Sequence, residues 1–153
     1  MTPDNSSLLR LAQASDLDTL VDMVERFNIE DGHPLENPVR EALATLIDDA
    51  SYGAAFMIGQ EEAGAPIGYA VLCHGFSIEF GGRDTILDEV WLVPEARGRG
   101  LGKRVLQELY DWSRENGFLA IHLEVMGDNP AMEIYLRDGF IDRGSRFMSK
   151  RLT

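Results

Sequence analysis

The sequence predicts a single domain of the mixed α/β (α+β) class, in which a mixed β-sheet is flanked by helices. Its length of 153 residues is typical of one domain. Short apolar runs alternate with segments whose apolar residues recur at helical spacing. No internal repeat or low-complexity linker divides the chain. We therefore expect one domain over residues 1–153.

The first half of the chain predicts a short strand, two helices and a hairpin. Residues 8–11 form the strand, and Asp16 suits the N-cap of a helix over 17–29. A second helix is predicted over 38–49, after the break at residues 31–34. Strands over 53–60 and 66–79 enclose a polar, turn-rich stretch at 61–66, which predicts a hairpin.

The second half predicts a strand, a long helix and a strand–helix–strand sequence. A turn at 81–84 precedes a strand over 85–93, which Pro94 ends. The helix over 100–116 has an apolar stripe and ends at Gly117. A strand over 119–125 and a short helix over 130–137 follow, and residues 140–152 supply a last strand or hairpin. The expected order is β-α-α-β-β-β-α-β-α-β.

Composition excludes several classes of function. The net charge of −12 argues against nucleic-acid binding and favours cationic substrates, although acidity also simply keeps a protein soluble. Cys73 is the single cysteine, so no internal disulfide forms, and its apolar surroundings indicate a buried small side chain. The three histidines lack the spacing of metal ligands, so we expect no metal. No segment resembles a membrane span or a signal peptide, so we expect a cytoplasmic protein without membrane contact.

The most informative segment is Arg97-Gly98-Arg99-Gly100-Leu101-Gly102-Lys103, where a strand turns into a helix. Glycines allow the backbone to approach a ligand, and the first turn of a helix offers free N–H groups to a phosphate. A P-loop is excluded because Arg97 stands where its first glycine belongs. The G-x-G-x-G pattern also departs from the dinucleotide fingerprint. The remaining alternatives are a phosphate loop of another kind and a simple turn.

Arg97-x-x-Gly100-x-Gly102 resembles the pyrophosphate loop of the GNAT superfamily of acyl-CoA N-acyltransferases. The preceding strand residues 87–95 and the downstream run from Leu123-Glu124-Val125 to Ala131, Tyr135, Gly139 and Phe140 are similar too. The resemblance covers residues 8–152 in element order and is specific over 87–140. It implies a GNAT-like, mostly antiparallel sheet whose fourth and fifth strands splay apart, with acetyl-CoA as the co-substrate.

The resemblance also implies which residues bind the cofactor. Backbone groups of Leu92 and Val93 pair with the pantetheine arm, and a backbone N–H near Val93 stabilises the oxyanion. The loop holds the pyrophosphate through Arg97, Gly98, Arg99, Gly100, Leu101, Gly102 and Lys103. Asn129 approaches the cofactor, although its spacing to Ala131 is one residue shorter than usual, which puts Asp128 at the family's asparagine position.

The implied reaction is direct attack of a neutral amine on the thioester, which requires a base for the ammonium form. Asp88 and Glu89 are the leading candidates, Glu124 follows, and Glu79 is a further one. Strand alternation places Asp88 and Glu89 on opposite faces of the sheet. Tyr135 matches the family's acid for the leaving thiolate, and Trp91 is expected in the core or pocket wall. Phe76, Glu79 and Phe80 are expected to shape the acceptor pocket.

These expectations predict an N-acetyltransferase for a small cationic primary amine, such as a polyamine, an amino acid or an aminoglycoside. The alternatives are acetylation of a protein N-terminus or lysine, and a non-catalytic module that binds acetyl-CoA. Dimers are common in this family, so a homodimer is one expected assembly.

Overall fold

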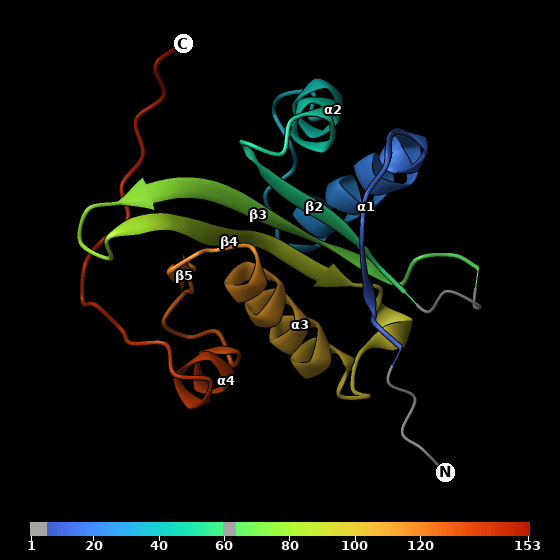
Figure 1. Cartoon of the computed structure of the whole chain (residues 1–153). Coiled ribbons are helices and arrows are strands. Elements are labelled where there is room, and N and C mark those ends of the chain that lie inside the picture. Colours follow the sequence, from blue (N-terminus) through green and yellow to red (C-terminus); the bar gives the residue numbers. More distant parts are fainter. Residues whose placement is uncertain (1–5, 60–63) are drawn as a thin grey trace. The chain divides into compact units, whose positions relative to one another are not determined.

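The structure of this protein is a computed structural model that describes residues 6–59 and 64–153 (Figure 1). The chain divides into two compact units, Met1–His122 and Leu123–Thr153. Within these residues, the first unit holds the β-sheet and three α-helices, and the second holds one α-helix. We describe each unit by itself.

The sheet has five strands in the order β1-β2-β3-β4-β5. Neighbouring strands are antiparallel except β4 and β5, which are parallel, so the predicted mixed and mostly antiparallel sheet is confirmed. Pairing of β2 with β3 also confirms the predicted hairpin, although residues 60–63 of its connection lie outside the described residues. The strands are β1 (Leu9–Leu11), β2 (Gly53–Ile58), β3 (Gly68–Ser77), β4 (Gly82–Leu92) and β5 (Ala120–His122).

Strands β4 and β5 are paired over only a short stretch. The pairing runs from Asp84 with Ala120 to Ile86 with His122. Strand β4 continues to Leu92, and no strand of the described residues pairs with its outer edge beyond Ile86. This end of β4 is therefore an open edge, as the predicted splaying of the fourth and fifth strands requires.

Helices α1 (Leu17–Glu30) and α2 (Arg40–Asp48) cover one face of the sheet (Figure 1). Leu20, Met23 and Val24 of α1 pack there against alternate residues of the strands, including Tyr69, Val71 and Trp91. Helix α3 (Leu101–Glu115) covers the other face, where Trp112 meets Phe56 edge-on at 5.1 Å between ring centroids. Removal of these apolar surfaces from water is the main force that holds the layers together.

Two details of the first unit differ from the sequence prediction. Strand β4 begins at Gly82 rather than at residue 85, because the turn occupies residues 78–81. Asp16 makes no side-chain N-cap bond to α1. It ends the 3₁₀ turn Ala14–Asp16 in a helical conformation, and its carboxylate instead accepts from the Arg10 guanidinium at 2.7 Å and the Gln13 N–H at 2.8 Å.

The second unit contains α4 (Met132–Arg137) and an extended C-terminal segment. The predicted last strand or hairpin over 140–152 is wrong, since the structure assigns no strand to these residues. Their apolar side chains, such as Phe147 and Met148, are largely exposed. A strand needs a partner edge as well as a suitable pattern, and the pattern alone says nothing about the edge. The predicted strand over 119–125 is also shorter, because β5 ends at His122.

Candidate active site

The glycine-rich segment forms a turn between β4 and α3. Gly98 and Gly100 have φ angles of 77° and 75°, a left-handed conformation that other residues adopt only with strain. A Cβ atom at Gly98, Gly100 or Gly102 would meet no other atom within 4 Å. The glycines therefore serve the backbone conformation and leave open space beside it.

The backbone N–H groups of residues 98–103 have no hydrogen-bond acceptor within the described parts of the chain. The first donor of the helical ladder is Arg104, whose N–H reaches the Gly100 carbonyl at 3.4 Å. These free donors lie at the N-terminus of α3, which is the positive end of its dipole, and Lys103 adds a positive charge beside them. A run of free N–H groups next to open space fits a diphosphate anion.

A β-bulge lies in the middle of β4. Val71 pairs with Glu89 and Leu72 with Leu87, so Asp88 is an extra residue without a partner on β3. A bulge turns two consecutive side chains toward the same side. Burial raises the pKa of Tyr69 and of Cys73, which share the face covered by α1, and the negative charges of Asp88 and Glu89 both raise these pKa values further. The prediction that strand alternation separates Asp88 from Glu89 is therefore wrong.

Glu89 is the more enclosed of the two carboxylates. The Tyr69 hydroxyl donates to its Oε1 at 3.2 Å, and the Asn28 side chain of α1 lies near enough to favour its charged form. Burial raises the pKa of Glu89, the charge of Asp88 raises it further, and the Tyr69 and Asn28 side chains partly oppose that rise. Partial desolvation raises the pKa of Asp88 as well. Such a carboxylate is a stronger base than an exposed one and suits proton transfer.

The last turn of α1 is tied to the end of β4. Glu30 accepts from the Trp91 Nε1–H at 3.3 Å and forms an ion pair with Arg97 at 2.7 Å. Arg97 also donates through Nε to the Leu92 carbonyl at 3.1 Å. The Arg26 guanidinium lies over the Trp91 ring, 5.0 Å from its centroid. Trp91 is thus buried in the core between the sheet and α1, which is one of the two places that the sequence predicts for it.

Backbone groups at the end of β4 differ in availability. The Val93 N–H donates to the Ile67 carbonyl at 2.9 Å, so it is already used. Successive residues of a strand direct their N–H groups to opposite edges, which aims the Leu92 N–H at the open edge of β4. Leu92, rather than Val93, therefore has the backbone N–H that is available to the pantetheine arm or the oxyanion.

The remaining predicted residues lie elsewhere. Phe76, Glu79 and Phe80 are at the β3–β4 turn, beyond Arg83, which is five residues before Asp88 and about 17 Å along the strand. The structure does not bring them together with Glu89. The Arg99 guanidinium donates to the Glu95 carbonyl at 2.9 Å, so only its backbone faces the open loop.

Three predicted residues belong to the second unit. The Asn129 side chain accepts from the Ala131 N–H at 2.9 Å, which shapes the start of α4. Tyr135 packs against Phe140, with 5.7 Å between ring centroids. Desolvation and the charge of Asp138 raise the pKa of Tyr135, so its hydroxyl keeps its proton at neutral pH. Glu124 lies outside the regular elements.

Sequence analysis missed Tyr69, Asn28 and Glu30 as members of the site. Tyr69 lies in an apolar run, where its hydroxyl gives no separate signal. Asn28 falls within the predicted helix over 17–29 and Glu30 just beyond it, and nothing in the local pattern shows that this helix packs against β4.

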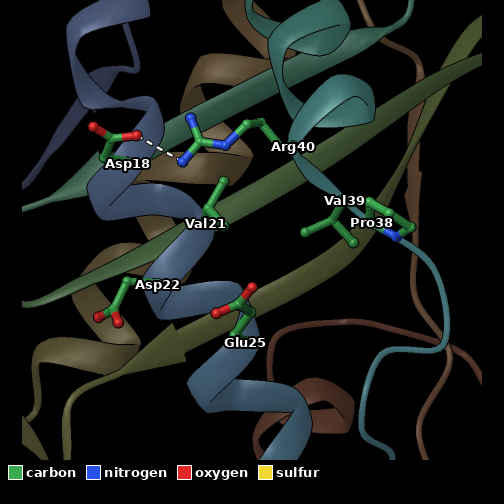
Figure 2. A pocket seen from close by; sticks show the side chains of 7 residues that line it. All are labelled: Asp18, Val21, Asp22, Glu25, Pro38, Val39 and Arg40. Atoms are coloured by element: carbon green, nitrogen blue, oxygen red, sulfur yellow. Dashed lines mark hydrogen bonds and ion pairs between the residues drawn. The ribbon is translucent and has the colours of Figure 1, made fainter.

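An open hollow of about 480 Å³ lies between α1 and the start of α2. Figure 2 shows the carboxylates of Asp18, Asp22 and Glu25 along α1, with Arg40 reaching across to Asp18 at 2.6 Å. The hollow shares no lining residue with the cluster around Glu89. We therefore keep it separate from the candidate active site.

The model of the acetyltransferase (GNAT) family matches residues 18–140. This chain belongs to the GNAT family. The match contains the glycine-rich turn, the bulge and α4, and membership supports an acyltransferase that uses acetyl-CoA, as the family does in general. Within the described residues, no helix has the length and apolar character that crossing a membrane requires.

Two curated relatives match about half of the chain. The chain is 33% identical over 81 residues to the uncharacterized N-acetyltransferase YhfO of Bacillus subtilis (strain 168), covering 52% of this chain and 54% of the relative. It is 26% identical over 78 residues to the thialysine N-ε-acetyltransferase of Bos taurus, covering 50% and 45%. The chain thus matches about half the length of these two curated relatives.

The fold is also similar to solved structures. An integron cassette protein, HFX_CASS3, from the mobile metagenome of Cole Harbour Salt Marsh superposes with a TM-score of 0.81 at 28% identity, covering 95% of this chain and 91% of that one. A possible acetyltransferase from Clostridium difficile 630 has the same TM-score of 0.81 at 15% identity, covering 95% and 97%, which supports the fold alone.

Proposed function

We propose that this protein transfers an acetyl group from acetyl-CoA to a small cationic primary amine, with Glu89 as the general base. The bulge at Asp88 carries the proposal, because it turns two carboxylates toward one side of β4 beside its open edge. One negative charge attracts the ammonium, and the other, with its raised pKa, accepts a proton. The net charge of −12 favours the approach of cations.

In the proposed reaction, the free N–H groups of residues 98–103 hold the diphosphate of acetyl-CoA, and the open edge of β4 admits the thioester arm. Glu89 removes a proton from the ammonium, directly or through a water molecule. The amine nitrogen then forms a bond to the carbonyl carbon, while the Leu92 N–H stabilises the developing oxyanion. The C–S bond breaks, and Tyr135 donates its proton to the thiolate that leaves. The nitrogen loses its second proton as the amide forms, and this proton returns through water to the Tyr135 oxygen.

A small acceptor is favoured by the surroundings of Glu89. Tyr69 of β3 and Asn28 of α1 lie beside its carboxylate, and a partly buried carboxylate of this kind suits a slender amine better than a folded chain. The name of the bovine relative refers to thialysine, an amino acid with a primary amine in its side chain, which agrees with this class.

The test is a thiol-release assay with acetyl-CoA and panels of polyamines, amino acids, aminoglycosides and peptides. We expect turnover with at least one small amine and a loss of kcat in the Tyr135→Phe variant. Turnover of peptides alone would reject the small-amine assignment. Calorimetry with acetyl-CoA serves as the control for cofactor binding. Binding without turnover of any amine, unchanged in Tyr135→Phe, would favour a non-catalytic acetyl-CoA-binding module.

A further inference from the structure

Arg97 is the first residue of the glycine-rich segment, but its side chain contacts residues outside that segment. Its guanidinium bonds to Glu30 of α1 at 2.7 Å and to the Leu92 carbonyl at 3.1 Å, and lies 6.0 Å from the centre of the Trp91 ring. Glu30 and the Trp91 ring lie on the side of β4 and α1 where Glu89 is found, and the Leu92 carbonyl lies at the open edge of β4. The anion-binding character of the segment comes from the N–H groups of residues 98–103, which are independent of this side chain.

Glu30 is the connecting member of this cluster. One carboxylate holds the indole N–H of Trp91 and the guanidinium of Arg97 at the same time. Glu30 is also the last residue of α1, and Asn28, which favours the charged form of Glu89, lies two residues earlier in the same helical turn. The position of the last turn of α1 against β4 therefore determines where Asn28 stands relative to Glu89.

We propose that Glu30 and Arg97 are positioning residues for the acceptor amine, which together lock the last turn of α1 against β4, and that the Arg97 side chain is not a ligand of the acetyl-CoA diphosphate. This inference rests on the proposed function for its acceptor, while its statement about acetyl-CoA stands independently. A guanidinium suits the role because its planar fork can bond to a carboxylate and to a carbonyl at once.

Both side chains are partly exposed, at 43% for Arg97 and 45% for Glu30, so their replacement leaves the core intact. We would compare Glu30→Gln, Arg97→Gln and the double variant with the parent protein. Arg114→Gln is the matched control, because Arg114 forms a similar ion pair with Asp111 at 2.9 Å within α3. Thermal unfolding of each variant checks that the fold is retained.

Titration calorimetry measures the affinity for acetyl-CoA. We expect Glu30→Gln and Arg97→Gln to keep a Kd within about twofold of the parent. A phosphate ligand would lose about tenfold or more, since charged hydrogen bonds contribute about 1.5–3 kcal/mol and 1.4 kcal/mol is tenfold. A tenfold weaker Kd in Arg97→Gln would overturn the proposal. This measurement needs no acceptor, so it remains decisive even if the amine screen fails and the proposed function with it.

Steady-state kinetics with the amine found in the screen test the acceptor side. We expect each single variant to raise the KM of the amine about five- to tenfold with little change in kcat, and the double variant to match the single ones. An unchanged KM, or effects that multiply in the double variant, would reject the proposal that Glu30 and Arg97 together position the last turn of α1. Equal losses in kcat for all variants, including Arg114→Gln, would indicate a general loss of structure and would also count against it.

Discussion

Replacement of Glu89 by glutamine is the most direct test of the proposed base. Glutamine has nearly the same shape and keeps an oxygen that accepts from the Tyr69 hydroxyl, so the local structure is retained. It cannot accept a proton from an ammonium. The expected result is a large fall in kcat with little change in the affinity for acetyl-CoA.

The size of the fall follows from the neighbourhood of Glu89. A positioned general base contributes about 10²- to 10⁴-fold to the rate. Asp88 lies on the same side because of the bulge and can partly replace it, which puts the expected loss near the lower limit. A loss of about 100-fold corresponds to about 2.7 kcal/mol in the activation barrier. Initial rates of thiol release at saturating acetyl-CoA measure it.

The pH dependence of kcat/KM gives a second test, because its acidic limb should shift in opposite directions in two variants. Activity falls at low pH as Glu89 becomes protonated, and its raised pKa places this limb above the usual range of a glutamate. Asp88→Asn removes a charge that raises this pKa, so the limb moves to lower pH. Tyr69→Phe removes a hydrogen bond that lowers it, so the limb moves to higher pH.

Two amines of different basicity separate this limb from ionisation of the substrate, because a limb of the enzyme stays in place when the amine is changed. The assignment of Glu89 is refuted if Glu89→Gln keeps more than about a third of kcat, since a general base contributes about 100-fold or more. It is also refuted if the acidic limb of kcat/KM stays at the same pH in both Asp88→Asn and Tyr69→Phe.

Three further predictions concern the loop and the core. Gly100→Glu puts a side chain and a negative charge where φ is 75° and the N–H groups are free, so calorimetry should show acetyl-CoA affinity reduced about tenfold or more; an unaltered affinity would contradict the loop assignment. Gly68→Ala should lower the free energy of unfolding in urea by about 2 kcal/mol or more, because its Cβ would overlap the Trp91 carbonyl oxygen in the β3–β4 pairing; a smaller loss would mean that this pairing adjusts freely. Ser113→Ala should raise it by about 0.5–1 kcal/mol, because the buried hydroxyl finds no partner among the described residues and alanine is the better helix former; a loss would reveal a bond that the hydroxyl makes.

Most elements of the first unit could be predicted because their sequence pattern and their packing agree. Leu20, Val24 and Phe27 have the spacing of a helix face, and the structure packs this side of α1 against the sheet. Leu101, Val105 and Leu109 give α3 in the same way. Residues 140–152 show the opposite case, because apolar residues such as Ile141 and Phe147 suggest a strand but remain exposed without one. A strand depends on a partner edge that no local pattern contains.

In the candidate site too, local features could be predicted from the sequence and contacts between distant segments could not. The loop at residues 98–103 could be predicted because glycines in left-handed conformations and a helix start are local features. The partners of Glu89 could not, since Asn28 and Tyr69 come from α1 and β3, far away in sequence. The direction of Arg97 toward Glu30 has the same origin, because the ion pair joins residues of α1 and of the segment after β4.

The bulge at Asp88 shows why one missed residue changes the chemistry. Alternation along β4 would give one carboxylate to each face, and each would act alone. The extra residue instead sets Asp88 and Glu89 on one side, where burial raises the pKa of Glu89 and the charge of Asp88 raises it further. Asp88 also supplies an attractive charge for a cation. A base and an anchor for an ammonium thus arise together from a single irregularity of the strand, at the edge that β5 leaves open.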